Sequence, residues 1–368
     1  MDERAVTTAT VVLVNATGIR SGAENVLVDV ARRLHASGRD IVLVSPPGPL
    51  VDAFPACARH VAIPTLGLEG RGGVGRLVGI GRVVARWIRA GRILRSVTKE
   101  HDVVIVNSLF ALPALPAAFP RPRRTGVTTW LVHDTVVSRK QQVAVAVGAA
   151  RLWRAVAVSE VTAASIRPQI PDVVVRPNGV RIPRDIVATT DRAPVVGILA
   201  ALTPWKGQDM LLEAIALCPG VTVEIAGGAL PGEEEYAQAL RERAERADLR
   251  GRVTFLGYVD RAEVLGRWAI AVSASVLPEA GPLGVLECMA AGLPVIATDH
   301  GGAAEYLADG AGVLVPPGDP LALARTVSDL LVDTQRRKEI AETARKRVAR
   351  QYDLERTLPA MVAALTAG

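Results

Sequence analysis

Apolar runs alternate with segments of helical periodicity along the first half of the chain. The segment at 23–38 carries Val26, Val30 and Leu34 at helical spacing and ends at Gly38. Strands that alternate with helices predict parallel βαβ units with right-handed crossovers. Apolar runs typical of buried parallel strands occur at 8–15, 40–46, 102–107, 128–132, 155–159 and 173–176.

The second half repeats this pattern after an irregular polar stretch at 181–194, which predicts a linker. Helical periodicity is found at 207–217, at 233–249 and from 320 onward. The two series predict an α/β protein with two Rossmann-like, doubly wound domains that face each other across a cleft. The second series has predicted strands at 194–200, 221–228, 252–257, 268–275, 294–299 and 311–317.

Length and composition agree with two globular domains, because 368 residues with 49% hydrophobic content can form two cores. The first residues, Met1–Arg4, carry acids where a signal peptide has basic residues, and no apolar run reaches roughly 18 residues. Cys57, Cys218 and Cys288 lack the spacing of a zinc or disulfide framework. We therefore expect a cytoplasmic protein.

The net charge of +6 is concentrated in a basic stretch, Arg71–Lys99, which contains no acid. Apolar residues alternate with its arginines, and Arg82, Arg86 and Arg89 fall on one helical face. One interpretation is a solvated face of a core helix. The other is a surface that binds anionic lipid headgroups, on the inner face of the plasma membrane. No nucleic-acid-binding motif accompanies the charge, so we expect no nucleic-acid partner.

A Gly- and Pro-bearing turn precedes one apolar helix in the second half, within Leu277–Pro294. Pro282 suits the first helical turn, Gly292 suits the closing position, and the helix is predicted at 282–291. The first N–H groups of such a helix, those of Leu283 and Gly284, have no acceptor inside the helix. They form a site suited to a phosphate.

Two carboxylates flank this helix start, Glu279 in the loop before it and Glu287 inside it. Both would repel a phosphate, but carboxylates accept hydrogen bonds from sugar hydroxyls. Glu279 could alternatively be a helix-dipole partner, and Glu287 a surface residue. Because the helix around Glu287 is apolar, its buried carboxylate needs a partner, which a ribose would supply. This layout predicts a nucleotide sugar as ligand.

The region "PEAGPLGVLECMAAGLPVIATDHGGAAEYLADGAGVLVPPGD" resembles the E-x7-E signature of glycosyltransferase family 4, the retaining nucleotide-sugar-dependent enzymes with the GT-B fold. The similarity extends over nearly the whole chain. Its other landmarks are "SGAENVLVDVARRLHASG", "WLVHDT", "VAVSE", "PNGV" and "LTPWKGQDMLLEAIA".

The resemblance implies a role for each matching residue. Glu279 would contact the transferred sugar, Glu287 the ribose, and the amides of Leu283 and Gly284 the diphosphate, together with Lys206. His133 would lie near the anomeric carbon. Gly22 would bring backbone amides to the phosphate, and Asn178–Gly179 would shape the crossing between domains. The family needs neither a cofactor nor a divalent metal. It also implies an amino-terminal acceptor-side domain at 1–183, a donor domain at 193–351, and a final helix at about 352–368 packed on the first domain.

The chain departs from the family pattern at two places. Ala201 stands where the family has an arginine, five residues before Lys206. Arg20 and Arg181 are candidates to replace that charge at the diphosphate. In addition, Pro282 would remove one N–H group from the anion site. Outside the family context, His133 could be a strand-end histidine and Gly22 a turn residue.

These features predict a metal-independent glycosyltransferase, a hexosyltransferase or a relative of one. It would transfer a sugar from a UDP-, GDP- or ADP-sugar to a hydroxyl acceptor with retention at the anomeric carbon. The acceptor would be a glycan, a lipid-linked molecule or a small molecule, in cell-envelope polysaccharide, glycolipid or natural-product glycoside biosynthesis. Two alternatives stay open: an inactive nucleotide-sugar-binding partner subunit, which Ala201 favours, and a nucleotide-sugar epimerase of the same fold.

Overall fold

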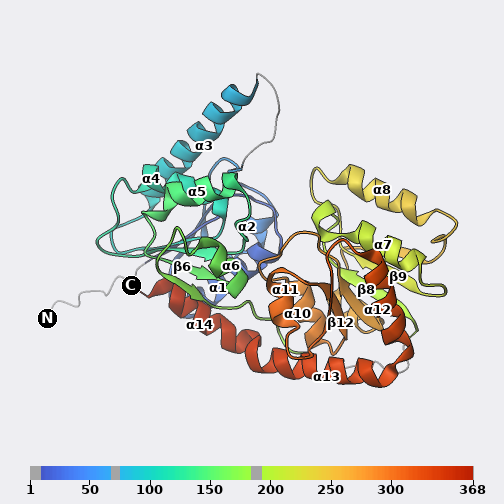
Figure 1. Cartoon of the computed structure of the whole chain (residues 1–368). Coiled ribbons are helices and arrows are strands. Elements are labelled where there is room, and N and C mark those ends of the chain that lie inside the picture. Colours follow the sequence, from blue (N-terminus) through green and yellow to red (C-terminus); the bar gives the residue numbers. More distant parts are fainter. Residues whose placement is uncertain (1–9, 68–74, 184–192, 368) are drawn as a thin grey trace. The chain divides into compact units, whose positions relative to one another are not determined.

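The chain forms two compact units in the computed structural model, which describes residues 10–67, 75–183 and 193–367 (Figure 1). Unit 1 comprises Met1–Asn178 and Thr357–Gly368, and unit 2 comprises Gly179–Arg356. The hydroxyl of Thr129 donates to Leu365 O at 2.9 Å, which attaches the last helix to the sheet of unit 1. Met1–Arg4 and most of the predicted linker lie outside the described residues.

Unit 1 is built on a parallel sheet that contains seven described strands, in the order β3-β2-β1-β4-β5-β6-β7. Every residue of β1, β2, β4 and β5 is buried, as continuous apolar runs predict. The strands are β1 (Val11–Val14), β2 (Ile41–Ser45), β3 (Arg59–Ala62), β4 (Val103–Val106), β5 (Thr128–Val132), β6 (Arg154–Ala157) and β7 (Val173–Val175). The helices are α1 (Gly22–Ala36), α2 (Pro49–Ala53), α3 (Gly75–Val97), η1 (Leu109–Ala114), α4 (Leu115–Ala118), α5 (Arg139–Ala149) and α6 (Glu160–Ile166).

Unit 2 repeats this architecture, and its six described strands have the order β10-β9-β8-β11-β12-β13. The strands are β8 (Val195–Leu199), β9 (Thr222–Ala226), β10 (Val253–Gly257), β11 (Ile270–Ser273), β12 (Val295–Thr298) and β13 (Val313–Val315). The helices are η2 (Pro204–Lys206), α7 (Gln208–Ala216), α8 (Glu234–Ala244), α9 (Arg261–Leu265), α10 (Leu283–Ala290), α11 (Gly301–Tyr306), α12 (Pro320–Val332) and α13 (Thr334–Gln351). The last helix, α14 (Leu354–Thr366), begins in unit 2 and ends in unit 1.

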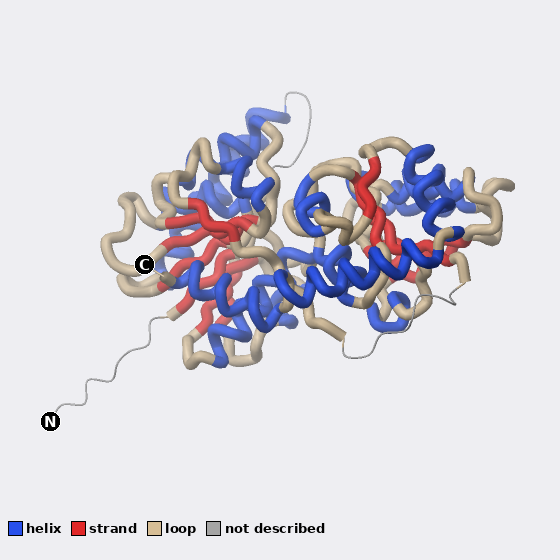
Figure 2. Tube along the Cα trace, turned by 60° about the horizontal axis from the view of Figure 1, so that its bottom comes forward, coloured by secondary structure: helices blue, strands red, loops and turns tan. Residues whose placement is uncertain are grey.

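The predicted α/β class with two doubly wound domains is confirmed, and Figure 2 shows each sheet among its helices. In both sheets the strand order reverses beside the first strand, between β1 and β4 and between β8 and β11. Ligands of open α/β sheets bind at the carboxyl ends of strands at such a reversal. This topology directs attention to the loops that follow these four strands.

Alternate residues of the unit 2 strands pack on opposite faces of the sheet. Val196 and Ile198 of β8 belong to a core that includes α7 and α12, whereas Val195 and Leu199 pack with α10 and α13. Gly197 lies between them, against the buried ring of Trp268: a Cβ there would be 1.8 Å from the ring. The two buried faces fix the sheet, and the sheet fixes the loops at its carboxyl edge.

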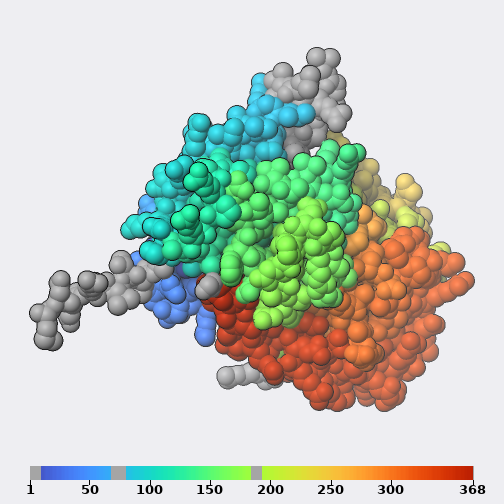
Figure 3. All heavy atoms as spheres, turned by 60° about the vertical axis from the view of Figure 1, so that its left-hand side comes forward, coloured from blue at the N-terminus to red at the C-terminus, as the bar shows by residue number. Residues whose placement is uncertain are grey.

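Helix α3 lies at the surface of unit 1, where Figure 3 shows it in blue and cyan. Its core side is Val83, Ala90 and Leu94, whereas Ile80, Val84 and Ile88 are exposed at 54%, 42% and 40%. Arg82 and Arg89 are exposed and Arg86 is half-buried. Arg71 lies outside the described residues, and the side chain of Arg76 is not described. Among the described helices, none has both the length and the hydropathy of a bilayer-spanning segment.

Candidate donor site in the carboxyl-terminal unit

Lys206 and Glu279 meet at the carboxyl edge of the unit 2 sheet, at the point of strand reversal. Lys206 ends η2, which follows β8, and its ammonium group forms an ion pair and hydrogen bond with the Glu279 carboxylate. The other Glu279 oxygen accepts a hydrogen bond from the Ser275 hydroxyl, which follows β11. Both charged side chains are largely buried, at 17% and 10% exposure. The ammonium also lies 4.2 Å from the ring centre of Trp205, a cation–π contact.

Backbone contacts hold together the loop after β8, which carries Lys206, and the loop after β11, which carries Glu279. Val276 N donates to Trp205 O at 2.9 Å. Gly207 has a φ of +67°, and a Cβ on it would lie 2.0 Å from Ala274 O. The loop after β8 therefore crosses the loop after β11 at a distance that only glycine permits, which places Lys206 beside Glu279.

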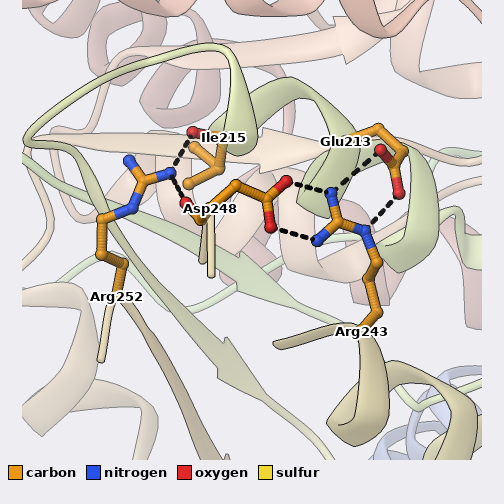
Figure 4. A network of polar contacts seen from close by, with 5 residues as sticks. All are labelled: Glu213, Ile215, Arg243, Asp248 and Arg252. Carbon is orange, nitrogen blue, oxygen red and sulfur yellow. Dashed lines mark hydrogen bonds and ion pairs between the residues drawn. The ribbon is translucent and has the colours of Figure 1, made fainter. Parts of the chain in front are cut away.

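The helix that follows Lys206, α7, is anchored at its far end by two arginines (Figure 4). Arg252 donates to the carbonyl oxygens of Ile215 (2.9 Å), Val221 (3.2 Å) and Cys218 near the helix end, and to Asp248 O. Arg243 forms ion pairs with Glu213 of α7 and with Asp248. These contacts satisfy carbonyls at the helix terminus, and so they fix the helix that carries the Lys206 loop.

The start of α10 lies in the same region, because Glu279 and the helix are joined by a short turn. A Cβ on Gly284 would lie 2.7 Å from Leu199 O at the end of β8. Pro282 is the N-cap, with φ −67° and ψ 106°, and the helix begins at Leu283. The prediction that Pro282 takes a place in the first helical turn is therefore corrected. The N–H groups of Leu283 and Gly284 are still the first of the helix, directed away from its body.

Glu287 faces a protein partner that the sequence did not indicate. Its carboxylate forms an ion pair and hydrogen bond with the Arg261 guanidinium, from the first residue of α9. The buried acid therefore has a protein partner in addition to the predicted ribose, whose contact with Glu287 stays a prediction. Burial raises the pKa of Glu287 to about 7, and the charge and hydrogen bond of Arg261 oppose that rise.

The structure describes the surroundings of Ala201 and of the two arginines proposed to replace the missing charge. Ala201 follows β8, and its carbonyl accepts a hydrogen bond from Gln208 Nε2 at 2.8 Å. Arg20 belongs to unit 1, where its Nε donates to Asn25 Oδ1 at 2.7 Å. Arg181 is exposed in unit 2, next to Val180, which bridges to Asp353. The part of either arginine in donor binding stays a prediction.

Unit 1 has its own polar cluster at the point of strand reversal. Asn15 follows β1 and Asn107 follows β4, and Asn107 Nδ2 donates to Asn15 Oδ1 at 3.0 Å. Asn15 Nδ2 donates in turn to Glu24 Oε1 at 3.2 Å. Glu24 forms a capping box with Ser21, and Gly22 is the first residue of α1. Because Glu24 engages the Ser21 N–H, the predicted phosphate-binding loop at Gly22 is held by its own helix cap.

His133 follows β5, the strand beside β4, at the same carboxyl edge of the unit 1 sheet. Its Nε2 is shielded from solvent and has no hydrogen-bond partner among the described residues. Burial lowers the pKa of His133 to about 4, so the imidazole is neutral at pH 7. Burial also raises the pKa of Asp134, an effect that a hydrogen bond from Leu109 N opposes and the charge of Glu24 increases. His133 can therefore exchange a hydrogen bond with a sugar hydroxyl but brings no positive charge.

Several residues of these sites escaped the sequence analysis. Asn15 and Asn107 had a signal, because both end a Val-Val-x-Val-Asn run. Ser275 stands four residues before Glu279, but a serine in a loop is not distinctive. Arg261 is 26 positions from Glu287 and had no signal. Within the described residues, no group of three His, Cys, Asp or Glu side chains is arranged to hold a metal ion.

Curated proteins match only part of this chain, which spans about half the length of the relatives it matches. The lipopolysaccharide core biosynthesis glycosyltransferase LpsE of Rhizobium meliloti is 31% identical over 180 residues, 48% of this chain and 51% of that protein. A GDP-mannose-dependent monoacylated alpha-(1-6)-phosphatidylinositol monomannoside mannosyltransferase of Corynebacterium glutamicum is 31% identical over 179 residues, 45% of each chain.

Solved structures match the whole chain. HepE of Anabaena, crystallised with UDP and glucose, superposes with a TM-score of 0.77 at 24% identity, covering 98% of this chain and 100% of that one. With its two parallel sheets, the protein has the predicted GT-B fold. The family model of glycosyl transferases group 1 matches residues 183–347, the segment that carries Lys206, Glu279 and Glu287. The carboxyl-terminal region is therefore similar to the glycosyl transferases group 1.

Proposed function

We infer that the protein is a retaining glycosyltransferase of the family 4 type, which transfers a sugar from a nucleoside-diphosphate sugar to a hydroxyl acceptor. One observation carries this proposal. Lys206, Glu279 and the N-terminus of α10 gather at the carboxyl ends of β8 and β11, the switch point of the unit 2 sheet. The Lys206 cation and the free amides at the helix start suit the diphosphate. The Glu279 carboxylate suits the hydroxyl groups of the sugar, because it accepts hydrogen bonds from them.

The Lys206–Glu279 ion pair can stay intact when a nucleotide sugar binds. An ammonium group has three N–H donors, so Lys206 retains donors for phosphate oxygens while it contacts Glu279. When the bond between the anomeric carbon and the diphosphate breaks, negative charge develops on the leaving phosphate. Lys206 and the amides of Leu283 and Gly284 stabilise that charge from fixed positions. The new bond forms to the acceptor oxygen on the same face, and the acceptor proton passes to the leaving phosphate.

For the acceptor side we propose the carboxyl edge of the unit 1 sheet, which carries the cluster of Asn15, Glu24 and Asn107 and, after β5, His133. The proposal requires no divalent ion, because Lys206 and the helix start supply the compensating charge. The alternatives are a binding subunit without turnover and a nucleotide-sugar epimerase. Ala201 favours the binding subunit, since the resemblance places an arginine at this position to help neutralise the diphosphate.

A panel of UDP-, GDP- and ADP-linked sugars tests the proposal by thermal shift and by release of nucleoside diphosphate. UDP-glucose and GDP-mannose come first, since UDP and glucose are bound in HepE and the mannosyltransferase relative depends on GDP-mannose. We expect at least one donor to raise the melting temperature and to release nucleotide when acceptor extract is added, equally with and without EDTA. Binding without release would favour the binding subunit, and an isomerised sugar the epimerase. No binding of any donor would overturn the proposal.

We further propose that α3 contacts an anionic membrane surface. Ile80, Val84 and Ile88 form an exposed apolar stripe at helical spacing. Exposed arginines lie on the same helix, and an apolar stripe with basic neighbours suits an interface of anionic lipid. On α5, Val143 and Val147 are exposed at 58% and 45%. The exposed arginines of α3 are Arg82, Arg89, Arg92 and Arg95.

Vesicle sedimentation tests this surface. We expect the protein to sediment with vesicles that contain phosphatidylglycerol, less at high salt because ions screen the arginines. Val84→Asp with Ile88→Asp should lower the bound fraction about tenfold, since two apolar contacts are lost. Val332→Asp is the matched control, because Val332 is 87% exposed in unit 2. Equal binding to neutral phosphatidylcholine vesicles, or no binding, would contradict the proposal.

A further inference from the structure

Arg261 is a charged residue that the structure adds to the predicted donor site. Asp260 caps the short helix α9, and its carboxylate accepts a hydrogen bond from Ala262 N at 2.9 Å. The cap fixes the first residue of α9, from which the guanidinium reaches across to Glu287 of α10. Arg261 is half exposed, at 51%, whereas Glu287 is only 17% exposed. A surface arginine thus holds a largely buried acid.

Within the part of the chain that the structure describes, Arg261 is the charged group recorded as acting on Glu287. Its neighbours on α10 are apolar or neutral, and burial keeps the Cys288 thiol protonated by raising its pKa. Strands β11 and β12, which pack on α10, contain no ionisable residue. Arg345, from the packed helix α13, donates instead to Ala290 O and Pro183 O. Glu305 of α11 is half-buried and its carbonyl accepts from Arg347.

We propose that Arg261 is a positioning residue for the nucleotide: its ion pair favours the carboxylate form of Glu287 and orients it to accept hydrogen bonds from the ribose hydroxyls. The proposal rests on the proposed function. The recorded contact engages Oε1 of Glu287. A carboxylate has about four lone-pair sites, so Oε2 and the rest of Oε1 remain for two hydroxyls. A protonated carboxyl group has no charge, and it can accept fewer hydrogen bonds than the carboxylate.

The direction of the pH effect follows from this arrangement. Burial raises the pKa of Glu287 to about 7 even with Arg261 in place. Nucleotide affinity therefore falls as the pH drops through that value, because protons compete with the ribose. Without Arg261 the pKa rises further, since the opposing charge and hydrogen bond are gone. The loss of affinity then begins at higher pH.

The experiment measures the dissociation constant for the nucleoside diphosphate that the wild-type protein binds in the donor panel, between pH 6 and 9. Arg261→Gln should bind about tenfold more weakly at pH 7 and recover toward wild-type affinity at pH 9. Arg261→Lys should restore most of the affinity at pH 7. Arg267→Gln is the matched control: it removes an arginine from another pair in unit 2, with Glu224, at nearly the same exposures of 53% and 17%.

A second measurement does not depend on nucleotide. Carbon NMR of labelled glutamate side chains, with Glu287→Gln to assign the signal, follows the Glu287 titration in the free protein. We expect its midpoint to rise in Arg261→Gln and to stay in Arg267→Gln. An unchanged midpoint, or an affinity loss equal at all pH values, would overturn the inference. If the wild-type protein binds no nucleoside diphosphate, the proposed function fails and this inference with it. Nucleotide binding with an unaltered pH profile in Arg261→Gln refutes the inference alone.

Discussion

Glu279→Gln is expected to lower the rate of sugar transfer about 100- to 1,000-fold, as for the loss of one preorganised charge-stabilising group. The carboxylate accepts from both Lys206 and Ser275, so it fixes the ammonium group as well as the sugar. The glutamine amide has the shape of the carboxylate but no charge. Its NH₂ group would point at one of the two hydrogen-bond donors, Lys206 or Ser275, and could not accept from it. The rate is measured as nucleotide release at saturating donor, with the melting temperature as a check on folding.

Lys206→Ala should lower the rate of sugar transfer by a similar factor. The double variant with Glu279→Gln should be little slower than either single variant. Residues that act as a unit give strongly non-additive effects. The matched control is the surface pair of Lys346 and Glu342, whose side chains are 68% and 70% exposed in the same unit. Lys346→Ala and Glu342→Gln should leave the rate unchanged. If Glu279→Gln retains a third or more of the wild-type rate, the Lys206–Glu279 pair does not contribute to sugar transfer.

Continuous apolar runs made the buried strands predictable, because both faces of a parallel sheet are covered. Strand β3, Arg59–Ala62, was missed for the opposite reason: among the described strands it pairs with β2 alone, at the sheet edge, and none of its residues is buried. The short helix α9, at Arg261–Leu265, was missed because five residues carry too little periodicity. The elements that lie at the margin of a core leave the weakest pattern.

Helix α3 shows a second limit. Val83, Ala90 and Leu94 lie in the core, whereas Ile80, Val84 and Ile88 are exposed. Both sets recur at helical spacing, so periodicity alone does not tell which one is buried. The choice is made by the neighbours, η1 and α4, on which α3 packs.

The candidate site combines predictable and unpredictable parts. The helix α10 followed from its flanking Pro and Gly, but it begins at Leu283, one residue after the predicted start at Pro282. The contact of Lys206 with Glu279, 73 positions apart, depends on β8 and β11 being neighbours in the sheet. Family resemblance suggested both residues, but only the three-dimensional structure shows the ion pair. Arg261 opposite Glu287 came from the fold alone.

Gly207→Ala is expected to reduce both stability and nucleotide affinity, because this glycine sets the position of Lys206. At φ +67° an L-residue costs roughly 1–2 kcal/mol. The new Cβ would also lie 2.0 Å from Ala274 O, so the two loops must separate. Overpacking of this kind adds roughly 1–3 kcal/mol. We therefore expect the free energy of unfolding to fall by roughly 2–5 kcal/mol, measured by denaturant titration.

Gly220→Ala separates the crossing of the loops from the effect of the backbone angle. Gly220 has φ +76°, in the same left-handed region, but no atom lies within 4 Å of the Cβ it would gain. It should lose only about 1 kcal/mol and keep wild-type affinity for nucleoside diphosphate. In Gly207→Ala the affinity should fall at least about tenfold, because a shift of about 1 Å at a positioned group has large effects. If both variants bind nucleotide like the wild-type protein, the close crossing of these loops is a matter of folding and does not position Lys206.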